Sequence, residues 1–175
     1  PDSSFQLISD PSGGGFPGLV VAILSAESAP KRTVTLIESD QRKATFLRTV
    51  ARETGINCTV LAKRIEETPG QDADVLSARA LADLDNLLLF AEHHLAEDGV
   101  ALFPKGKSWG KEVEDANRQW SFDLEPIKSW TEPSAAILKI KGISVSDLSR
   151  PEGPRIIAVA NQKGGVGKTT TSAAI

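Results

Sequence analysis

Short apolar runs and longer amphipathic segments alternate along most of the chain. Apolar runs rich in β-branched residues, which are typical of buried strands, occur at residues 33–38 (TVTLIE), 58–63 (CTVLAK), 73–78 (ADVLSA) and 100–106 (VALFPKG). Residues 17–27 (PGLVVAILSAE), before the first of these runs, read as a buried helix with Pro17 near its first turn. The alternation over residues 12–141 predicts an α/β fold with a mostly parallel sheet and helices on both faces.

The segment at residues 39–55 (SDQRKATFLRTVARETG) carries the start and stop signals of a helix. Ser39 or Asp40 can cap its beginning, and Gly55 can end it. Its apolar stripe is predicted to consist of Phe46, Leu47, Val50 and Ala51.

Residues 81–99 (LADLDNLLLFAEHHLAEDG) predict a second long helix, which closes at Gly99. His93 and His94 lie near its end and are predicted to be surface residues. A shorter helix is expected at residues 111–120 (KEVEDANRQW), and two final strands at 121–130 (SFDLEPIKSW) and 135–141 (AAILKIK) are expected to pair.

The composition changes after Lys141. Residues 142–154 (GISVSDLSRPEGP) are rich in Ser, Pro and Gly and predict a linker, and residues 155–160 (RIIAVA) predict one more strand. We therefore expect a main domain at 1–141, a linker at 142–154 and a short terminal piece at 155–175.

The charge and the cysteine content exclude several classes of protein. The formal net charge is −3, and residues 1–141 carry 16 basic and 21 acidic residues, or −5, so RNA binding would need a local basic patch. The single cysteine, Cys58, has no disulfide partner, no Cys/His cluster has metal-binding spacing, and no apolar run approaches the ~20 residues of a membrane span. An intracellular, cytoplasmic protein is expected. The chain begins at Pro1 and contains no Met, which we interpret as a fragment.

A glycine-rich turn at residues 12–18 (SGGGFPG) stands where a first strand should meet a first helix. Glycines there let the backbone approach a ligand, and the helix N-terminus favours anions. Glu38 ends the next strand about 20 residues later, where an acid can accept hydrogen bonds from ribose hydroxyls. Together they predict an adenosine-type ligand. The alternatives are a tight turn without a ligand and a solvated carboxylate.

Several motifs in a fixed order resemble one family. GFPG, IESDQRK, AKRIEE, SARAL and ALFPKG together are similar to the RsmG family, also called GidB. The resemblance covers about residues 12–141. It implies a class I, Rossmann-like methyltransferase fold, S-adenosylmethionine as cofactor and methylation of guanine N7 in the 16S rRNA of the small ribosomal subunit.

The resemblance also implies a set of site residues. The cofactor would be bound by Gly13, Gly15, Phe16, Glu38, Ile65, Glu66 and Arg79. Lys105 and Lys107 would contact RNA phosphate. No catalytic residue is expected, because guanine N7 already has a lone pair and needs no general base. No metal-binding residue is expected either. Alternatively, Phe16 is a core residue, Arg79 pairs with a carboxylate such as Asp83, and Lys105 is a solvated turn residue.

The chain departs from the family at its beginning. Ser9, Asp10 and Pro11 stand where the family has Asp, Leu and Gly, and a proline cannot replace a glycine that lets the cofactor approach. We interpret residues 1–11 as doubtful and suggest that they are translated out of frame. The family's N-terminal helical segment is also missing, so activity is expected to be impaired.

The last residues carry a different motif. KGGVGKTT resembles the deviant phosphate loop of ParA/MinD-type partition ATPases, in which the nucleotide would be bound by Lys163, Gly164, Gly165, Gly167, Lys168, Thr169 and Thr170. ATP and Mg²⁺ would bind only if that domain were complete, so we expect no ATPase activity. The chain then resembles a methyltransferase fused to the start of a partition ATPase. The alternatives are a partition ATPase fragment with an unrelated N-terminal extension and a non-catalytic remnant of a gene fusion.

Overall fold

The computed structural model describes residues 7–9, 15–29, 32–79 and 81–146. The expected strand at 155–160 and the phosphate loop at 163–170 lie outside these residues, as do Gly13, Asp10 and Pro11.

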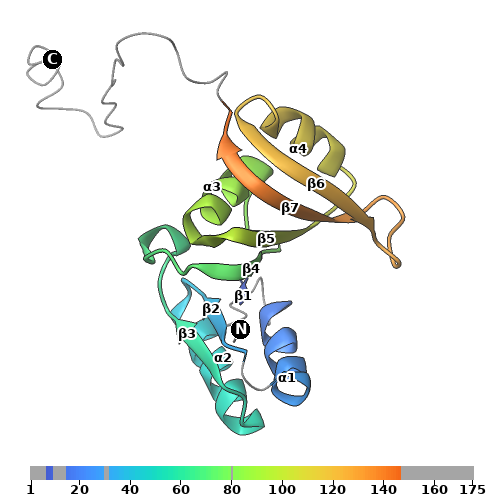
Figure 1. Cartoon of the computed structure of the whole chain (residues 1–175). Helices are drawn as coiled ribbons and strands as arrows, with labels where there is room; N and C mark the ends of the chain where they lie inside the picture. The colour runs from blue at the N-terminus through green and yellow to red at the C-terminus, as the bar shows by residue number, and fades with distance from the viewer. Residues whose placement is uncertain (1–6, 10–14, 30–31, 80, 147–175) are drawn as a thin grey trace, which may run out of the picture.

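Seven strands form one sheet in the described part of the chain, in the order β3-β2-β1-β4-β5-β7-β6 (Figure 1). The strands are β1 (Leu7–Ser9), β2 (Val34–Ile37), β3 (Cys58–Leu61), β4 (Ala73–Ser77), β5 (Leu95–Lys105), β6 (Trp120–Lys128) and β7 (Ala136–Val145). Neighbours from β3 to β5 pair in parallel, and β7 runs antiparallel to both β5 and β6. The predicted α/β fold with a mostly parallel sheet is confirmed.

Four helices and one short 3₁₀ turn connect these strands: α1 (Gly18–Ser28), α2 (Gln41–Thr54), η1 (Ile65–Glu67), α3 (Leu84–His94) and α4 (Trp109–Ala116). The chain steps one way along the sheet from β1 to β3 and the other way from β4 to β6. Since parallel crossovers are right-handed, α1 and α2 cover one face while α3 and α4 cover the other (Figure 1). Helices on both faces were predicted.

The predicted caps at the two ends of α2 are confirmed. The Asp40 carboxylate accepts hydrogen bonds from the backbone N–H groups of Arg42 at 2.8 Å and Lys43 at 3.1 Å. Gly55 closes the helix with a φ of 67°, a conformation that glycine adopts without strain. The predicted stripe is wrong at Phe46, which is 51% exposed, and Ala44 is buried in its place. Ala44 precedes Leu47 by three residues and therefore shares its face of the helix.

The predicted end of α3 is also wrong. The helix ends at His94 instead of Gly99, and Leu95 turns into extended backbone and pairs with Ala73 of β4. A Cβ at Gly99 would lie 2.8 Å from the carbonyl oxygen of Ala73, so this close approach of the strands requires glycine. Strand pairing with β4 therefore ends the helix early.

The two final strands pair as expected, but β7 is longer than predicted. It continues through Gly142 to Val145, which lies opposite Trp120 of β6. Residues 142–145 thus belong to the sheet and not to the expected linker, because antiparallel pairing with β6 extends to Val145.

The buried apolar residues form two clusters on the two faces. The cluster beneath α3 and α4 contains Ile37, Ile65, Ala73, Leu76, Ala78, Leu84, Leu87, Leu88, Ala91, Ala101, Phe103, Ala116, Trp120, Ala136, Leu138 and Ile140. The cluster beneath α1 and α2 contains Leu19, Ala22, Val34, Leu36 and Leu47. We call them the α3/α4 cluster and the α1/α2 cluster. None of the helices in the described ranges has the length and apolar character needed to cross a membrane.

Candidate functional site

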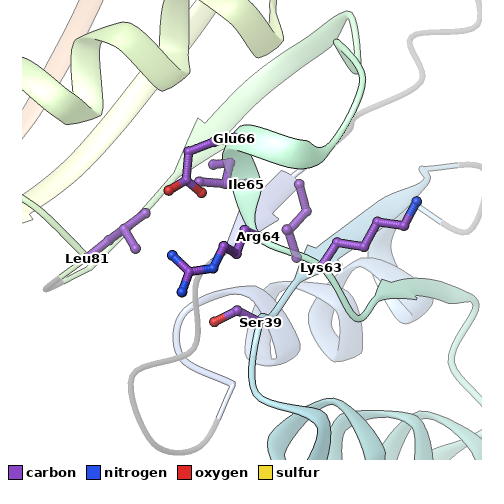
Figure 2. A pocket seen from close by; sticks show the side chains of 7 residues that line it. Ser39, Lys63, Arg64, Ile65, Glu66 and Leu81 are labelled. Atoms are coloured by element: carbon purple, nitrogen blue, oxygen red, sulfur yellow. The ribbon is translucent and has the colours of Figure 1, made fainter. Parts of the chain in front are cut away.

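A hollow of about 130 Å³ opens where β2, β3 and β4 end (Figure 2). Its lining residues are Ile37, Ser39, Lys63, Arg64, Ile65, Glu66 and Leu81. Open α/β sheets bind ligands outside the carboxyl ends of their strands, so the position is the expected one. A larger hollow of about 260 Å³ lies where α3 ends and β5 begins, and it contains none of the predicted ligand-binding residues. We call the first one the carboxyl-edge hollow.

Glu38 lies at the end of β2, between two residues that line this hollow. Its side chain is 2% exposed, and its Oε1 atom accepts a hydrogen bond from the backbone N–H of Asp40 at 2.7 Å. Its Oε2 atom is buried, and no group in the described ranges donates to it. A buried carboxylate oxygen without a partner is costly. Glu38 is therefore placed to accept a hydrogen bond from a ligand.

The turn after Glu38 is stabilised by the beginning of α2. Hydrogen bonds from the backbone N–H groups of Lys43 and Arg42 hold the pKa of the Asp40 carboxyl below its usual value. Asp40 is therefore ionised at neutral pH. Its negative charge lies near the positive end of the helix dipole and stabilises the beginning of α2. This cap sets the direction in which the chain leaves β2 and so positions Ser39 at the hollow.

The segment 63–66, which follows β3 and includes the first two residues of η1, supplies four of the lining residues. Ile65 is 8% exposed and belongs to the α3/α4 cluster, whereas Glu66 is exposed. In Figure 2 the side chains of Arg64, Glu66 and Ser39 extend toward the side on which Leu81 lies, and the ammonium end of Lys63 points away. The hollow thus has an apolar floor and a polar, charged rim.

Two histidines at the end of α3 contact η1 and the residue that follows it. His94 Nε2 lies 3.2 Å from the carbonyl oxygen of Ile65, and His93 Nε2 lies 3.2 Å from that of Thr68. The prediction of two surface histidines is wrong for His94, which is fully buried and contacts Ile65 of η1, and right for His93. Burial lowers the pKa of His94, only partly opposed by the hydrogen bond to Ile65. His94 is therefore neutral at neutral pH.

Gly15 and Phe16 lie in the turn before α1. Gly15 has a φ of 82°, and a Cβ there would meet Leu19 Cβ and Leu47 Cδ2 at 2.8 Å, so the position requires glycine for packing as well as conformation. Phe16 is 54% exposed and is not a core residue. Neither residue lines the carboxyl-edge hollow, and Gly13 lies outside the described residues.

Arg79 follows β4 and is exposed, on the same edge of the sheet as the hollow. It is not among the lining residues. Leu81, two residues later, does line the hollow, so the loop after β4 reaches the site through a leucine. The structure thus brings Ile65 and Glu66 together next to Glu38, and leaves Phe16 and Arg79 outside this hollow.

Lys105 ends β5 on the same edge, and its ammonium group is not presented to solvent. Its Nζ donates to the carbonyl oxygen of Ala82 at 2.9 Å and to Glu112 Oε2 at 2.7 Å, and its side chain is 11% exposed. These contacts tie the loop after β4 to α4. They favour a structural role over the predicted contact with RNA phosphate. Lys107, two residues later, is exposed.

Five lining residues were not predicted: Ile37, Ser39, Lys63, Arg64 and Leu81. Four of them adjoin predicted residues in the chain, since Ile37 and Ser39 flank Glu38, and Lys63 and Arg64 precede Ile65. Adjacency to a strand end was the available signal for those four. For Leu81 the available signal was its place at the end of the SARAL motif. No cluster of metal-binding side chains occurs in the ranges that the structure describes.

Solved structures with a similar fold include two methyltransferases. A predicted O-methyltransferase from Agrobacterium tumefaciens gives a TM-score of 0.60 at 16% identity, and covers 81% of this chain and 76% of that one. A SAM-dependent methyltransferase from Aquifex aeolicus gives a TM-score of 0.60 at 13% identity, and covers 79% of this chain and 82% of that one. At these identities the likeness establishes the fold, a class I methyltransferase sheet.

Relatives in sequence are much closer. "Ribosomal RNA small subunit methyltransferase G" of Ruegeria sp. (strain TM1040) is 61% identical over 132 residues, which are 75% of this chain and 64% of that protein. The protein with the same name from Ruegeria pomeroyi is 56% identical over 133 residues, 76% of this chain and 65% of that one. The chain thus spans a little under two thirds of their length. The sequence profile named GidB, rRNA small subunit methyltransferase G, matches residues 6–138. The chain therefore belongs to the GidB family.

Proposed function

We propose that the chain binds S-adenosylmethionine and transfers its methyl group to guanine N7 in the 16S rRNA of the small ribosomal subunit. The family membership supports the reaction class. The observation that carries the proposal is Glu38, a buried carboxylate with one unpartnered oxygen beside the carboxyl-edge hollow. An acid at the end of the second strand of such a sheet accepts hydrogen bonds from ribose hydroxyls. Acting on ribosomal RNA would place the protein in the cytoplasm.

The residues present fit the adenosine part of this cofactor. Glu38 Oε2 would accept from a ribose hydroxyl, which would satisfy the buried oxygen. Ile65 and Ile37 offer an apolar surface for the adenine ring, and Glu66 offers a carboxylate at the rim. Gly15 and Phe16, in the turn before α1, remain proposed contacts for the rest of the cofactor, together with Gly13 and Arg79.

The chemistry places few demands on side chains. The bound cofactor would supply an activated methyl group on a sulfonium centre. Guanine N7 has an in-plane lone pair and needs no general base, so the contribution of the protein is alignment of the reacting atoms. We therefore propose no acid–base residue. Exposed Lys107 would contact RNA phosphate, and Lys105 would act indirectly, by holding the loop after β4.

Calorimetry with S-adenosylhomocysteine tests the cofactor site through Glu38. Glu38→Ala should weaken binding at least tenfold, because a hydrogen bond to a charged group is worth about 1.5–3 kcal/mol. Glu38→Gln keeps the size and one acceptor and should lose less. Glu53→Gln, an exposed acid at the far end of α2, is the matched control and should bind like the parent chain. Equal affinities for Glu38→Ala and the control would refute the proposed site.

Methyl transfer tests the substrate. Small ribosomal subunits that lack the modification are incubated with the chain and radiolabelled S-adenosylmethionine, and the 16S rRNA is treated with borohydride and aniline, which cleave at N7-methylguanine. Label together with cleavage at one guanine is the expected result. Label without cleavage would mean that an atom other than guanine N7 is methylated. Cofactor binding without any label would favour a non-catalytic remnant.

The start of the glycine motif is expected to limit this activity. We propose that Ser9, Asp10 and Pro11 weaken contact with the amino-acid end of the cofactor. Replacing the three by Asp, Leu and Gly should strengthen binding of S-adenosylhomocysteine in the same calorimetric assay. Unchanged affinity would mean that these residues do not contact the cofactor.

We also propose that residues 163–170 derive from the phosphate loop of a partition ATPase. The motif alone supports this proposal. Phosphate release from ATP, measured against a Lys168→Ala control, tests this proposal. Hydrolysis above the control would favour the partition ATPase as the function.

A further inference from the structure

We propose that His94 is a positioning residue for the cofactor, because it holds η1 where Ile65 and Glu66 line the carboxyl-edge hollow. His93 assists at the other end of the same turn. The identity of the ligand rests on the proposed function, whereas the link between the histidines and η1 does not.

The two histidines bind the two ends of one short turn. His94 Nε2 is 3.2 Å from the carbonyl oxygen of Ile65, the first residue of η1, and His93 Nε2 is 3.2 Å from that of Thr68, directly after it. Their rings meet edge to face, with centroids 4.6 Å apart. Two consecutive side chains at the end of α3 thus contact both ends of η1, which lies 25–29 residues earlier in the sequence.

A turn of this length needs such support. Its internal bonds are Glu67 N–H to the Arg64 carbonyl at 3.1 Å, Thr68 N–H to the Ile65 carbonyl at 3.2 Å, and Thr68 Oγ1 to the Arg64 carbonyl at 2.9 Å. Single 3₁₀ turns have poor hydrogen-bond geometry and little stability of their own. The Ile65 carbonyl accepts one hydrogen bond within the turn, from Thr68 N–H. It accepts a second one from His94, which belongs to α3 and therefore holds the turn from outside.

The bonding chemistry determines the tautomer of His94. A carbonyl oxygen can only accept, so Nε2 must carry the proton. Nδ1 then carries a lone pair, and it is buried with no partner in the part of the chain that the structure describes. In this neutral form the ring donates to Ile65 without placing a charge in the core.

Removal of this one donor should affect η1 more than α3. The helix is held by its own apolar residues Leu84, Leu87, Leu88 and Ala91, all at most 1% exposed. The segment 63–66 contributes four of the seven lining residues of the hollow. A shift of η1 would therefore change the hollow while α3 stays packed.

Two substitutions in the full chain separate the donor from the bulk of the ring. His94→Leu fills the space without a donor, and His94→Gln keeps an amide donor near the position of Nε2. We expect His94→Leu to weaken S-adenosylhomocysteine binding about tenfold, as for loss of one hydrogen bond. The KM for S-adenosylmethionine should rise equally, with kcat changed less than about twofold. His94→Gln should recover most of the affinity.

Leu88→Ala is the control for loss of stability alone. It removes a fully buried side chain from the same helix, away from the contact with η1, so it should lower the melting temperature and leave the affinity unchanged. If His94→Leu binds like the parent chain, or if Leu88→Ala loses as much affinity, the positioning role is refuted.

Amide exchange gives a test that needs no ligand. The Thr68 amide should exchange faster in His94→Leu than in the parent chain, relative to amides of β7, and should not do so in Leu88→Ala. Unchanged relative exchange would overturn the proposal. If the parent chain fails to bind S-adenosylhomocysteine while Thr68 responds as expected, the proposed function fails and the link between His94 and η1 stands.

Discussion

The two faces of the sheet differ in how much apolar surface they bury. Among residues whose burial is described, sixteen form the α3/α4 cluster and five the α1/α2 cluster. On the α1/α2 side several large apolar side chains are exposed, namely Phe16, Ile23, Leu24 and Phe46. Since apolar burial is the main stabilising term, we infer that the stability of the chain depends mostly on the α3/α4 face.

The candidate site lies where the two regions meet. Ile37 and Ile65, at the floor of the carboxyl-edge hollow, belong to the α3/α4 cluster although they come from β2 and η1. The polar rim comes from Ser39, Lys63 and Arg64, around the first three strands. A well-packed floor therefore supports a rim on the less buried side. Local unfolding should affect the rim before the floor.

The largest effect is expected from Phe103→Ala, in the centre of the α3/α4 cluster. Phe103 is fully buried in β5, and removal of such a ring should lower the free energy of unfolding by about 3–5 kcal/mol. Leu36→Ala, equally buried but in the smaller α1/α2 cluster, should lose about 2–3 kcal/mol. Urea unfolding measures both.

Leu24→Ala on α1 is the control for this pair. The side chain is 59% exposed, so its removal should change the free energy of unfolding by no more than about 0.5 kcal/mol. If Leu36→Ala proved as costly as Phe103→Ala, the stability would be shared evenly and the comparison of the two faces would fail.

A smaller effect is expected where the α3/α4 side anchors the loop that carries Leu81. Lys105→Ala removes a nearly buried ammonium group and leaves Glu112 and the Ala82 carbonyl without it. We expect a loss of about 1–3 kcal/mol in the free energy of unfolding. Lys139→Ala breaks the more exposed pair with Glu125 and should lose less than about 1 kcal/mol. Equal losses would mean that burial of the Lys105 pair contributes nothing.

Local patterns in the sequence were sufficient for most of the fold. The caps of α2 at Asp40 and Gly55 follow from residue types that suit those positions. The apolar runs predicted the strands from β2 onward, because buried strands have few other compositions. Glu38 could be placed at the edge of the sheet, because a strand end must lie there.

What could not be predicted depends on residues distant in the chain. The end of α3 at His94 is determined by pairing between Leu95 and Ala73, and nothing in the local pattern indicates that partner. His94 is buried and contacts Ile65, 29 residues earlier, and no local pattern indicates that contact. The role of Lys105 depends in the same way on Ala82, 23 residues earlier, and neither the predicted contact with RNA phosphate nor the alternative of a solvated turn residue included this partner.

The smallest changes in the free energy of unfolding are expected from two glycines, one from each side of the sheet. Gly55 ends α2 with a φ of 67°, where an L side chain is strained, so Gly55→Ala should lower the free energy of unfolding by about 1 kcal/mol. Gly110 lies in α4 with an ordinary helical backbone, and a Cβ there meets no atom within 4 Å. Gly110→Ala should therefore raise the free energy of unfolding by about 0.5–1 kcal/mol. Urea unfolding of both variants gives the signs, and because neither glycine has a neighbour to displace, opposite signs can come only from the backbone. If both variants had a lower free energy of unfolding than the parent chain, a side chain at Gly110 would be unfavourable in spite of its open surroundings.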